Sequence, residues 1–217
     1  MKTLFIATGN AHKIEEIRYT LQETVRLPSQ RDTSVRLEIE ETGATFQENA
    51  LIKSATWAGY FASALCSMGV THVLADDSGL EVDCLKGAPG VHSARFAAMD
   101  SGRSGNSTDA ENNAKLIRCL AEQPQTRWVA RFRCVLALTP VLPGKSLATM
   151  AAATEFFDGT CEGQIRIKAG GIDGFGYDPL FIPEGYNQTF GELEREVKNS
   201  ISHRARALTQ LSARLND

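Results

Sequence analysis

The sequence predicts an α/β fold in which a long mixed β-sheet is flanked by helices. A short apolar run over residues 3–8 ends in Gly-Asn, and apolar residues then recur at helical spacing over 14–21. Two Thr-x-x-Glu capping boxes, at 45–48 and 108–111, are typical helix starts. Apolar and polar residues alternate over 128–138, as they do in a half-buried strand.

The remaining segments complete a single domain over residues 1–217. We expect strands over 35–40, 71–76, 147–157 and 164–168, with a tight turn at Ser78-Gly79 directly after the second of these segments. A C-terminal helix is expected to carry its apolar residues on one side: Ile201, Leu208, Leu211 and Leu215. The chain contains no internal repeat, low-complexity tract or domain linker.

Composition excludes several classes of protein. The 217 residues are 42% hydrophobic and carry a formal net charge of −3, which argues against a protein that coats nucleic acids or binds anionic membranes. The N-terminus lacks a signal-peptide pattern, and no stretch reaches the roughly 20 apolar residues of a membrane span. Five scattered cysteines without a C-x-x-C pair indicate neither a disulfide framework nor a zinc site. We therefore expect a soluble cytoplasmic protein.

The stretch LADDSGLEVD places Asp76 and Asp77 side by side at the end of an apolar run. Alone, this pattern favours a strand end in which Asp77 accepts backbone hydrogen bonds. Further carboxylates lie in EIEETG, and lysines lie in NAHK and ENALIK. Carboxylate oxygens suit Mg²⁺, which usually completes its shell with water and substrate phosphates, and lysines suit the phosphates. Taken singly, Lys13, Lys53 and Lys198 are more often solvated helix residues.

Five blocks, in order, resemble the inosine triphosphate pyrophosphatase (Ham1-like) family over almost the whole chain. They are ATGNAHK, EETGATFQENALIKSA, LADDSGLEVDCLKGAPGVHSARF, GGIDGFGYDPLF and KNSISHRARAL. The resemblance implies two lobes with an active-site cleft between them, and a homodimer. It also implies Mg²⁺-dependent hydrolysis of the triphosphates of hypoxanthine and xanthine nucleosides (ITP, dITP, XTP) to monophosphate and pyrophosphate.

The resemblance also assigns roles to residues of this chain. It implies that Glu40 and Asp77 bind the metal and that Asp77 activates water. Given that assignment, we expect Asp76 to hold the ion or Asp77 without binding the metal directly. The phosphates would contact Lys53, Ser78 and the loop formed by Thr8, Gly9, Asn10, Ala11, His12 and Lys13. The base would contact Phe175, Gly176, Tyr177, Asp178, Lys198, His203 and Arg204.

Chemistry supports the choice of base. Hypoxanthine carries an acceptor oxygen at C6, where adenine carries an amino donor, and the guanidinium of Arg204 has only donors. Phe175 or Tyr177 is a candidate for stacking on the purine. In the competing interpretation Arg204 is a solvated or salt-bridged helix residue, paired for example with Glu194 or Glu196.

Three alternatives remain open at this point. A Maf-like nucleotide pyrophosphatase would share the reaction and differ in base preference. A nucleotide- or RNA-binding module would bind without turnover and without metal. A phosphatase with an aspartate nucleophile would pass through a covalent aspartyl phosphate and release orthophosphate.

Overall fold

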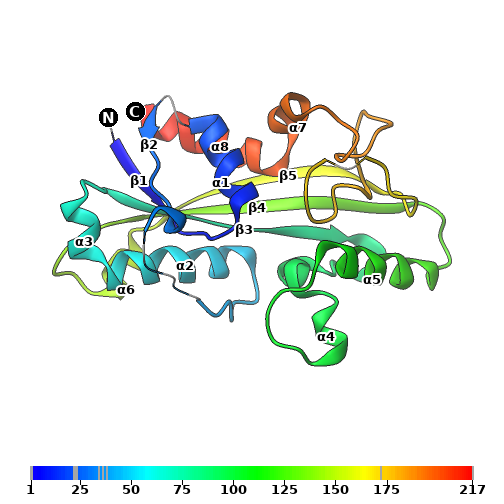
Figure 1. Ribbon diagram of the computed structural model, residues 1–217, viewed down its shortest axis with the longest axis horizontal. Helices are drawn as coiled ribbons and strands as arrows, with labels where there is room; N and C mark the ends of the chain where they lie inside the picture. The colour runs from blue at the N-terminus through cyan, green and yellow to red at the C-terminus, as the bar shows by residue number, and fades with distance from the viewer. Residues whose placement is uncertain are drawn as a thin grey trace. The chain divides into compact units, whose positions relative to one another are not determined.

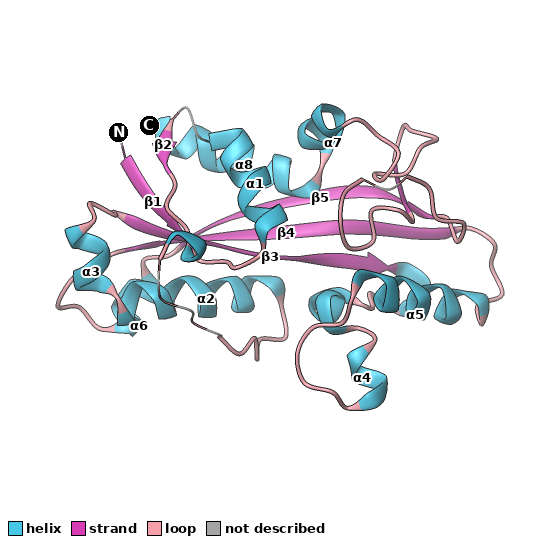
Figure 2. Cartoon of the chain, in the orientation of Figure 1, coloured by secondary structure: helices cyan, strands magenta, loops and turns pink. Residues whose placement is uncertain are grey.

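The structure, a computed structural model, describes residues 2–21, 24–33, 35, 37, 39–171 and 173–216 (Figures 1 and 2). Its strands are β1 (Lys2–Ile6), β2 (Val25–Arg26), β3 (His72–Val82), β4 (Trp128–Pro140), β5 (Glu155–Ile165) and β6 (Phe181–Pro183). Its α-helices are α1 (Ala11–Leu21), α2 (Phe46–Tyr60), α3 (Ala62–Ser67), α4 (Ala98–Ser101), α5 (Asp109–Ala121), α6 (Leu147–Ala152), α7 (Arg195–Ile201) and α8 (His203–Asn216). Short 3-10 helices lie at Gln30–Asp32, Asp83–Leu85 and Gly90–Arg95.

The strands form a mixed sheet in the order β2-β1-β3-β4-β5-β6. Strand β1 runs parallel to both β2 and β3, with Leu4 opposite His72 and Ile6 opposite Leu74. Strands β5 and β6 are antiparallel. The predicted α/β class with a long mixed sheet is therefore confirmed.

The chain divides into two compact units. The first comprises Met1–Asp77, Cys134–Gly159 and Arg204–Asp217, and the second comprises Ser78–Arg133 and Thr160–His203. In the first unit, α1 and α8 cover one face of the sheet, while α2, α3 and α6 cover the other (Figure 1). Each face thereby buries its own apolar core.

The second unit has one apolar core, built on the segments of β3, β4 and β5 that belong to it. Phe132 of β4 lies at its centre, with ring centroids 4.8 Å from Phe181 and 6.1 Å from Phe190. Leu116 and Leu120 of α5 are fully buried in the same core. This packing fixes the loop that precedes β6, which carries candidate base-binding residues.

Both predicted capping boxes are confirmed. The Thr45 side chain accepts a hydrogen bond from the Glu48 amide, and the Glu48 carboxylate accepts one from the Thr45 amide. Thr108 and Glu111 make the same reciprocal pair at the start of α5. Two of the amides that a helix start leaves unpaired are satisfied in this way.

The predicted turn at Ser78-Gly79 is wrong, because β3 continues through both residues to Val82. Charge pairing is the physical reason, since each aspartate in the strand meets a cation on its own face. The strand predicted over 147–157 is also wrong in its first half. Ser146 accepts a hydrogen bond from the Thr149 amide and caps helix α6, and β5 begins only at Glu155.

Other boundaries differ less. The strand predicted over 164–168 is the end of β5, which stops at Ile165. The C-terminal helix is interrupted, so Ile201 belongs to α7 and the other three predicted apolar residues to α8. In the strand predicted over 35–40, residues 36 and 38 lie outside the described residues, and the described positions of that segment are not in a strand.

Two predictions about the whole chain concern cysteines and membranes. All five cysteines are free. No described helix has the length and the apolar character that crossing a membrane requires.

Candidate active site

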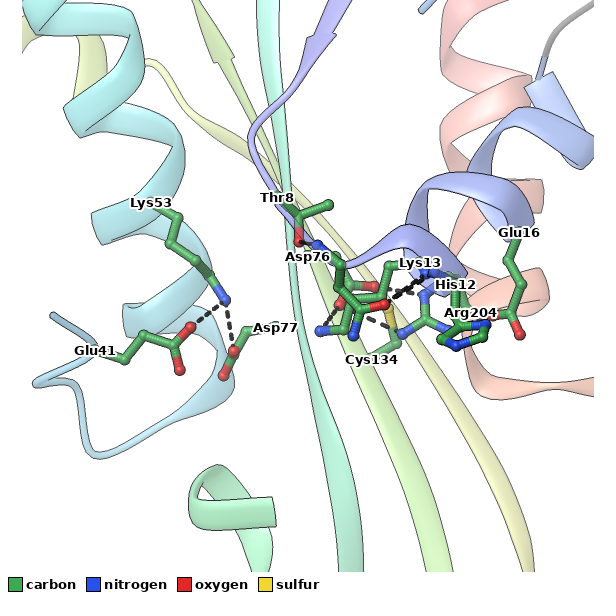
Figure 3. Close-up of polar contacts among 11 residues, drawn as sticks. Thr8, His12, Lys13, Glu16, Glu41, Lys53, Asp76, Asp77, Cys134 and Arg204 are labelled. Atoms are coloured by element: carbon green, nitrogen blue, oxygen red, sulfur yellow. Dashed lines mark hydrogen bonds and ion pairs between the residues drawn. The ribbon is translucent and has the colours of Figure 1, made fainter. Parts of the chain in front are cut away.

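Asp76 and Asp77 are consecutive residues of β3, and their side chains lie on opposite faces of the strand (Figure 3). Both are buried, with 1% and 5% of their surface exposed. Asp76 pairs with Lys13 at the start of α1 and with Arg204 of α8, whereas Asp77 pairs with Lys53 of α2. The two like charges therefore do not share one site.

Asp76 uses both carboxylate oxygens as acceptors. Oδ1 accepts from Lys13 Nζ, and Oδ2 accepts from Arg204 Nε at 2.7 Å and from the Cys134 thiol at 3.1 Å. Burial alone would raise the pKa of Asp76, but the charges of Arg204 and Lys13 hold this pKa well below its usual range. Glu16 of α1 binds Arg204 Nη1 on the far side of the guanidinium. Asp76 thus holds two cations in place, and its expected support of a metal ion or of Asp77 stays a prediction.

The loop before α1 presents Lys13. The Asn10 side chain caps the helix, since its Oδ1 accepts from the amides of His12 at 3.0 Å and Lys13 at 3.2 Å. The backbone N–H of Asn10 donates in turn to Thr8 Oγ1 at 3.2 Å. Gly9 and Asn10 are exposed. The predicted phosphate loop is therefore an ordered turn at the surface with a lysine fixed by Asp76 at its end.

Lys53 bridges two carboxylates on the other face of β3. Its Nζ lies 2.7 Å from Asp77 Oδ1 and 2.9 Å from Glu41 Oε1. Burial lowers the pKa of Lys53, but the charges of Asp77 and Glu41 outweigh burial and raise it. Burial raises the pKa of Asp77, although Lys53 opposes this shift. A raised pKa makes the ionised carboxylate a stronger base, so Asp77 is a candidate proton acceptor.

The second carboxylate that Lys53 binds, besides Asp77, belongs to Glu41. Glu40, the metal ligand assigned from the resemblance, is exposed. Glu41 is placed by the turn that follows it. The Gly43 amide donates to Asn49 Oδ1 at 2.8 Å, and a Cβ at Gly43 would lie 2.6 Å from the Glu48 Cβ. Only glycine fits this close approach of the turn to helix α2. The sequence analysis did not single out Glu41, because its contact with Lys53 depends on how the turn before helix α2 docks onto Asn49.

The Glu41–Asp77 pair suits a divalent cation. Asp77 Oδ2 is buried and has no hydrogen-bond partner among the described residues, which is costly for a carboxylate oxygen. Mg²⁺ typically takes one or two protein carboxylates and draws its other ligands from water and phosphates. Within the described residues no group of three or more His, Cys, Asp or Glu could hold a metal. The donor set therefore fits a metal that arrives with phosphate ligands.

In the second unit, the residues 174–178 form a tight turn that Asp178 closes. Asp178 Oδ2 accepts from the Phe175 amide at 2.9 Å. Gly174 has a φ of +82°, and a Cβ there would lie 2.2 Å from Asp178 Oδ2, so glycine is required. The Gly176 amide donates to Asp109 Oδ2 of α5 at 2.7 Å. Helix α5 thus anchors this turn.

Lys198 of α7 joins the turn through a buried ion pair. Its Nζ lies 2.7 Å from Asp178 Oδ2 and 4.8 Å from the centroid of the Phe175 ring. Phe175 is half-buried, whereas Tyr177 is 3% exposed and donates through its hydroxyl to the Ser93 carbonyl. The structure thus brings Phe175, Asp178 and Lys198 together, and it leaves the Phe175 ring more exposed than Tyr177.

The remaining predicted residues have the following positions. His203 stacks on Phe132 at a centroid distance of 4.8 Å and an interplanar angle of 13°. Arg204 is 1% exposed and is held by Asp76 and Glu16. Ser78 follows Asp77 in β3 and is half-buried, and His12 is exposed.

Known proteins resemble the chain over nearly its full length. A dITP/XTP pyrophosphatase of Exiguobacterium sibiricum is 45% identical over 213 residues, which cover 98% of this chain and 96% of that protein. A dITP/XTP pyrophosphatase of Desulforamulus reducens is 44% identical, with 98% and 95% covered. The solved structure of a HAM1 protein from Coxiella burnetii superposes with a TM-score of 0.81 at 36% identity, covering 100% of this chain and 99% of that one.

A sequence profile described as the Ham1 family matches residues 4–214. The match spans the features described above, namely the five sequence blocks, the mixed sheet and the two adjacent aspartates of β3. The chain belongs to the Ham1 family.

Proposed function

We propose that the chain is a Mg²⁺-dependent hydrolase that cleaves the triphosphates of non-canonical purine nucleosides (dITP, XTP and ITP) to the monophosphate and pyrophosphate. The names and high identity of the curated relatives support this activity. The observation that carries the proposal is Asp77, a buried carboxylate with one oxygen on Lys53 and the other unpartnered.

Glu41 and Asp77 are the residues that would hold the metal ion. When bound, Mg²⁺ neutralises phosphate charge and lowers the pKa of a water molecule. Asp77 accepts the proton of the attacking water, so no histidine is needed as a base. Cleaving a phosphoanhydride requires little covalent participation from the protein, and positioned charges do most of the work.

Lys13 and Lys53 bind the phosphates in this proposal. The Lys13 ammonium is held by Asp76 and is therefore positioned before the substrate arrives, whereas the Lys53 ammonium is held by Asp77 and changes partners when it binds phosphate. An ammonium that is oriented in advance loses little further freedom when it binds phosphate. The role of Asp76 is then to position Lys13, and Cys134 and Arg204 keep the Asp76 carboxylate oriented.

The base is recognised by Phe175, Asp178, Lys198, His203 and Arg204. Lys198 and Arg204 carry only donors and match the C6 oxygen of hypoxanthine and xanthine, whereas the amino group of adenine would face them unpaired. A site built on such bonds rejects the wrong base by about 10⁴-fold or more.

Lys13→Ala is expected to lower kcat/KM for every triphosphate by a similar factor, because a phosphate contact carries no information about the base. The lost charge-assisted contact corresponds to about 1.5–3 kcal/mol of transition-state stabilisation. The measurement is kcat/KM for dITP, XTP and dATP in both proteins. A change in base preference larger than the loss of efficiency would remove Lys13 from the phosphates.

Glu41→Gln is expected to raise the Mg²⁺ concentration needed for half-maximal activity, because a carboxylate that faces the metal loses its charge. Glu40→Gln is the matched control, since Glu40 is the neighbouring and exposed acid. Mg²⁺ titrations of dITP hydrolysis compare the two variants with the unchanged protein. A larger effect of Glu40→Gln would show that Glu40 is the metal ligand, as the resemblance implies. Glu41 would then only pair with Lys53.

We also infer a cytoplasmic homodimer. Free cysteines in all five positions suit a reducing compartment. Tyr60 at the end of α2 is 77% exposed and Leu147 of α6 is 45% exposed, and a Cβ at Gly59, next to Tyr60, would lie 3.2 Å from Leu147 Cδ1. Exposed apolar side chains that lie together are typical of contact surfaces. Sedimentation velocity measures the mass in solution, and a monomer at micromolar concentration would contradict the inference.

A further inference from the structure

We propose that Lys53 is an internal counter-cation: without nucleotide, its ammonium group occupies the position between Glu41 and Asp77 that a divalent cation requires, and it moves to the phosphates when Mg²⁺ and the triphosphate bind. This inference rests on the proposed function, and it concerns the order in which the charges assemble.

The geometry of the three side chains carries the proposal. Figure 3 shows the Lys53 ammonium between the carboxylates of Glu41 and Asp77, with Nζ–O distances of 2.9 Å and 2.7 Å. The Lys53 side chain is 11% exposed and the Asp77 side chain 7% exposed, so water screens this pair poorly. Two carboxylates that share one cation are the arrangement that a divalent metal also adopts.

Charge makes the two cations competitors. Lys53, Glu41 and Asp77 together carry one net negative charge, and a divalent ion added to that set would make it positive and would repel the ammonium. A bound triphosphate supplies several negative charges and removes this conflict. Lys53 therefore suppresses metal binding until a triphosphate is present.

The side chain of Lys53 is suited to this movement. A lysine carries a compact charge on a flexible four-carbon stem, so its ammonium can change partners while the helix that carries it stays in place. Asp77 Oδ2, buried and without a hydrogen-bond partner among the described residues, offers the metal a ligand that Lys53 leaves unused.

The test measures Mn²⁺ binding in the absence of nucleotide, by the loss of the free-ion electron paramagnetic resonance signal. Lys53→Met keeps an unbranched side chain, one heavy atom shorter, and removes its charge. It is expected to bind Mn²⁺ about tenfold more tightly than the unchanged protein, because no ion pair has to open first. An equal or lower affinity in Lys53→Met would overturn the proposal.

Lys13→Met is the matched control, because Lys13 pairs with Asp76 on the opposite face of β3. It removes the same charge and should raise Mn²⁺ affinity less than Lys53→Met does. Equal increases in the two variants would show a general effect of net charge and would contradict the specific role of Lys53.

Glu41→Gln keeps the test decisive if Lys53→Met fails to fold. With one carboxylate gone, Mn²⁺ affinity without nucleotide should fall, and an unchanged affinity would overturn the shared position of the two cations. Binding without nucleotide is independent of which triphosphate is hydrolysed. Failure of the proposed function would appear instead as absent pyrophosphate release with the Mn²⁺ results intact.

Discussion

Asp77→Asn is expected to fold normally and to lose turnover of dITP by about 10²–10⁴-fold from removal of the general base alone, with a further loss from the missing ligand charge. Folding should persist because asparagine is neutral, and burial of the Asp77 carboxylate already disfavours its charged form. The measurement is kcat for pyrophosphate release at saturating Mg²⁺, with circular dichroism to confirm the fold.

Asp158→Asn is the control for this substitution. Asp158 is an exposed residue of β5, and the same change there should leave turnover unaltered. Near-normal turnover in Asp77→Asn would refute the role of Asp77 as proton acceptor and as metal ligand together.

Arg204→Ala is expected to destabilise the fold by about 3–5 kcal/mol, because it removes the partner of buried negative charges. The guanidinium is 1% exposed and pairs with Asp76 on one side and Glu16 on the other. Burial would otherwise raise the pKa of Asp76, so the variant leaves a carboxylate that is costly to ionise. Chemical denaturation gives the free energy of unfolding.

Arg206→Ala is the matched control for stability. Arg206 is exposed on the same helix two residues later, and its loss should change stability by less than about 0.5 kcal/mol. Equal stability of Arg204→Ala and Arg206→Ala would show that the ion pairs of Arg204 do not stabilise the packing of α8 on the sheet.

Arg204→Ala also tests the proposed contact between Arg204 and the base. If Arg204 donates to the C6 oxygen, the ratio of kcat/KM for dITP to that for dATP falls in Arg204→Ala, whereas a purely structural role lowers both values together. Because the variant is expected to be less stable, the ratio must be taken at a temperature where it is fully folded.

The sequence predicted the fold wherever a local pattern matched a local interaction. The capping boxes at Thr45 and Thr108, and the helical spacing of Ile14, Ile17 and Leu21, gave helix starts and buried faces that the structure confirms. Such signals involve residues within four positions of each other, so they do not depend on tertiary context.

The errors arose where distant residues decide. Adjacent aspartates read locally as a strand end, and only Lys13, Lys53 and Arg204, far away in sequence, allow β3 to continue through them. In the same way, no spacing in the sequence reveals that Arg204 pairs with Asp76 and Glu16. Nor does any spacing reveal that Glu41 pairs with Lys53.

Pyrophosphate release from dITP, XTP and dATP, measured with and without Mg²⁺, decides whether the chain has the proposed activity. The proposed function predicts pyrophosphate and monophosphate from dITP and XTP, little reaction with dATP, and none when Mg²⁺ is removed by a chelator. Release of orthophosphate, turnover without a divalent cation, or a preference for dATP would contradict it.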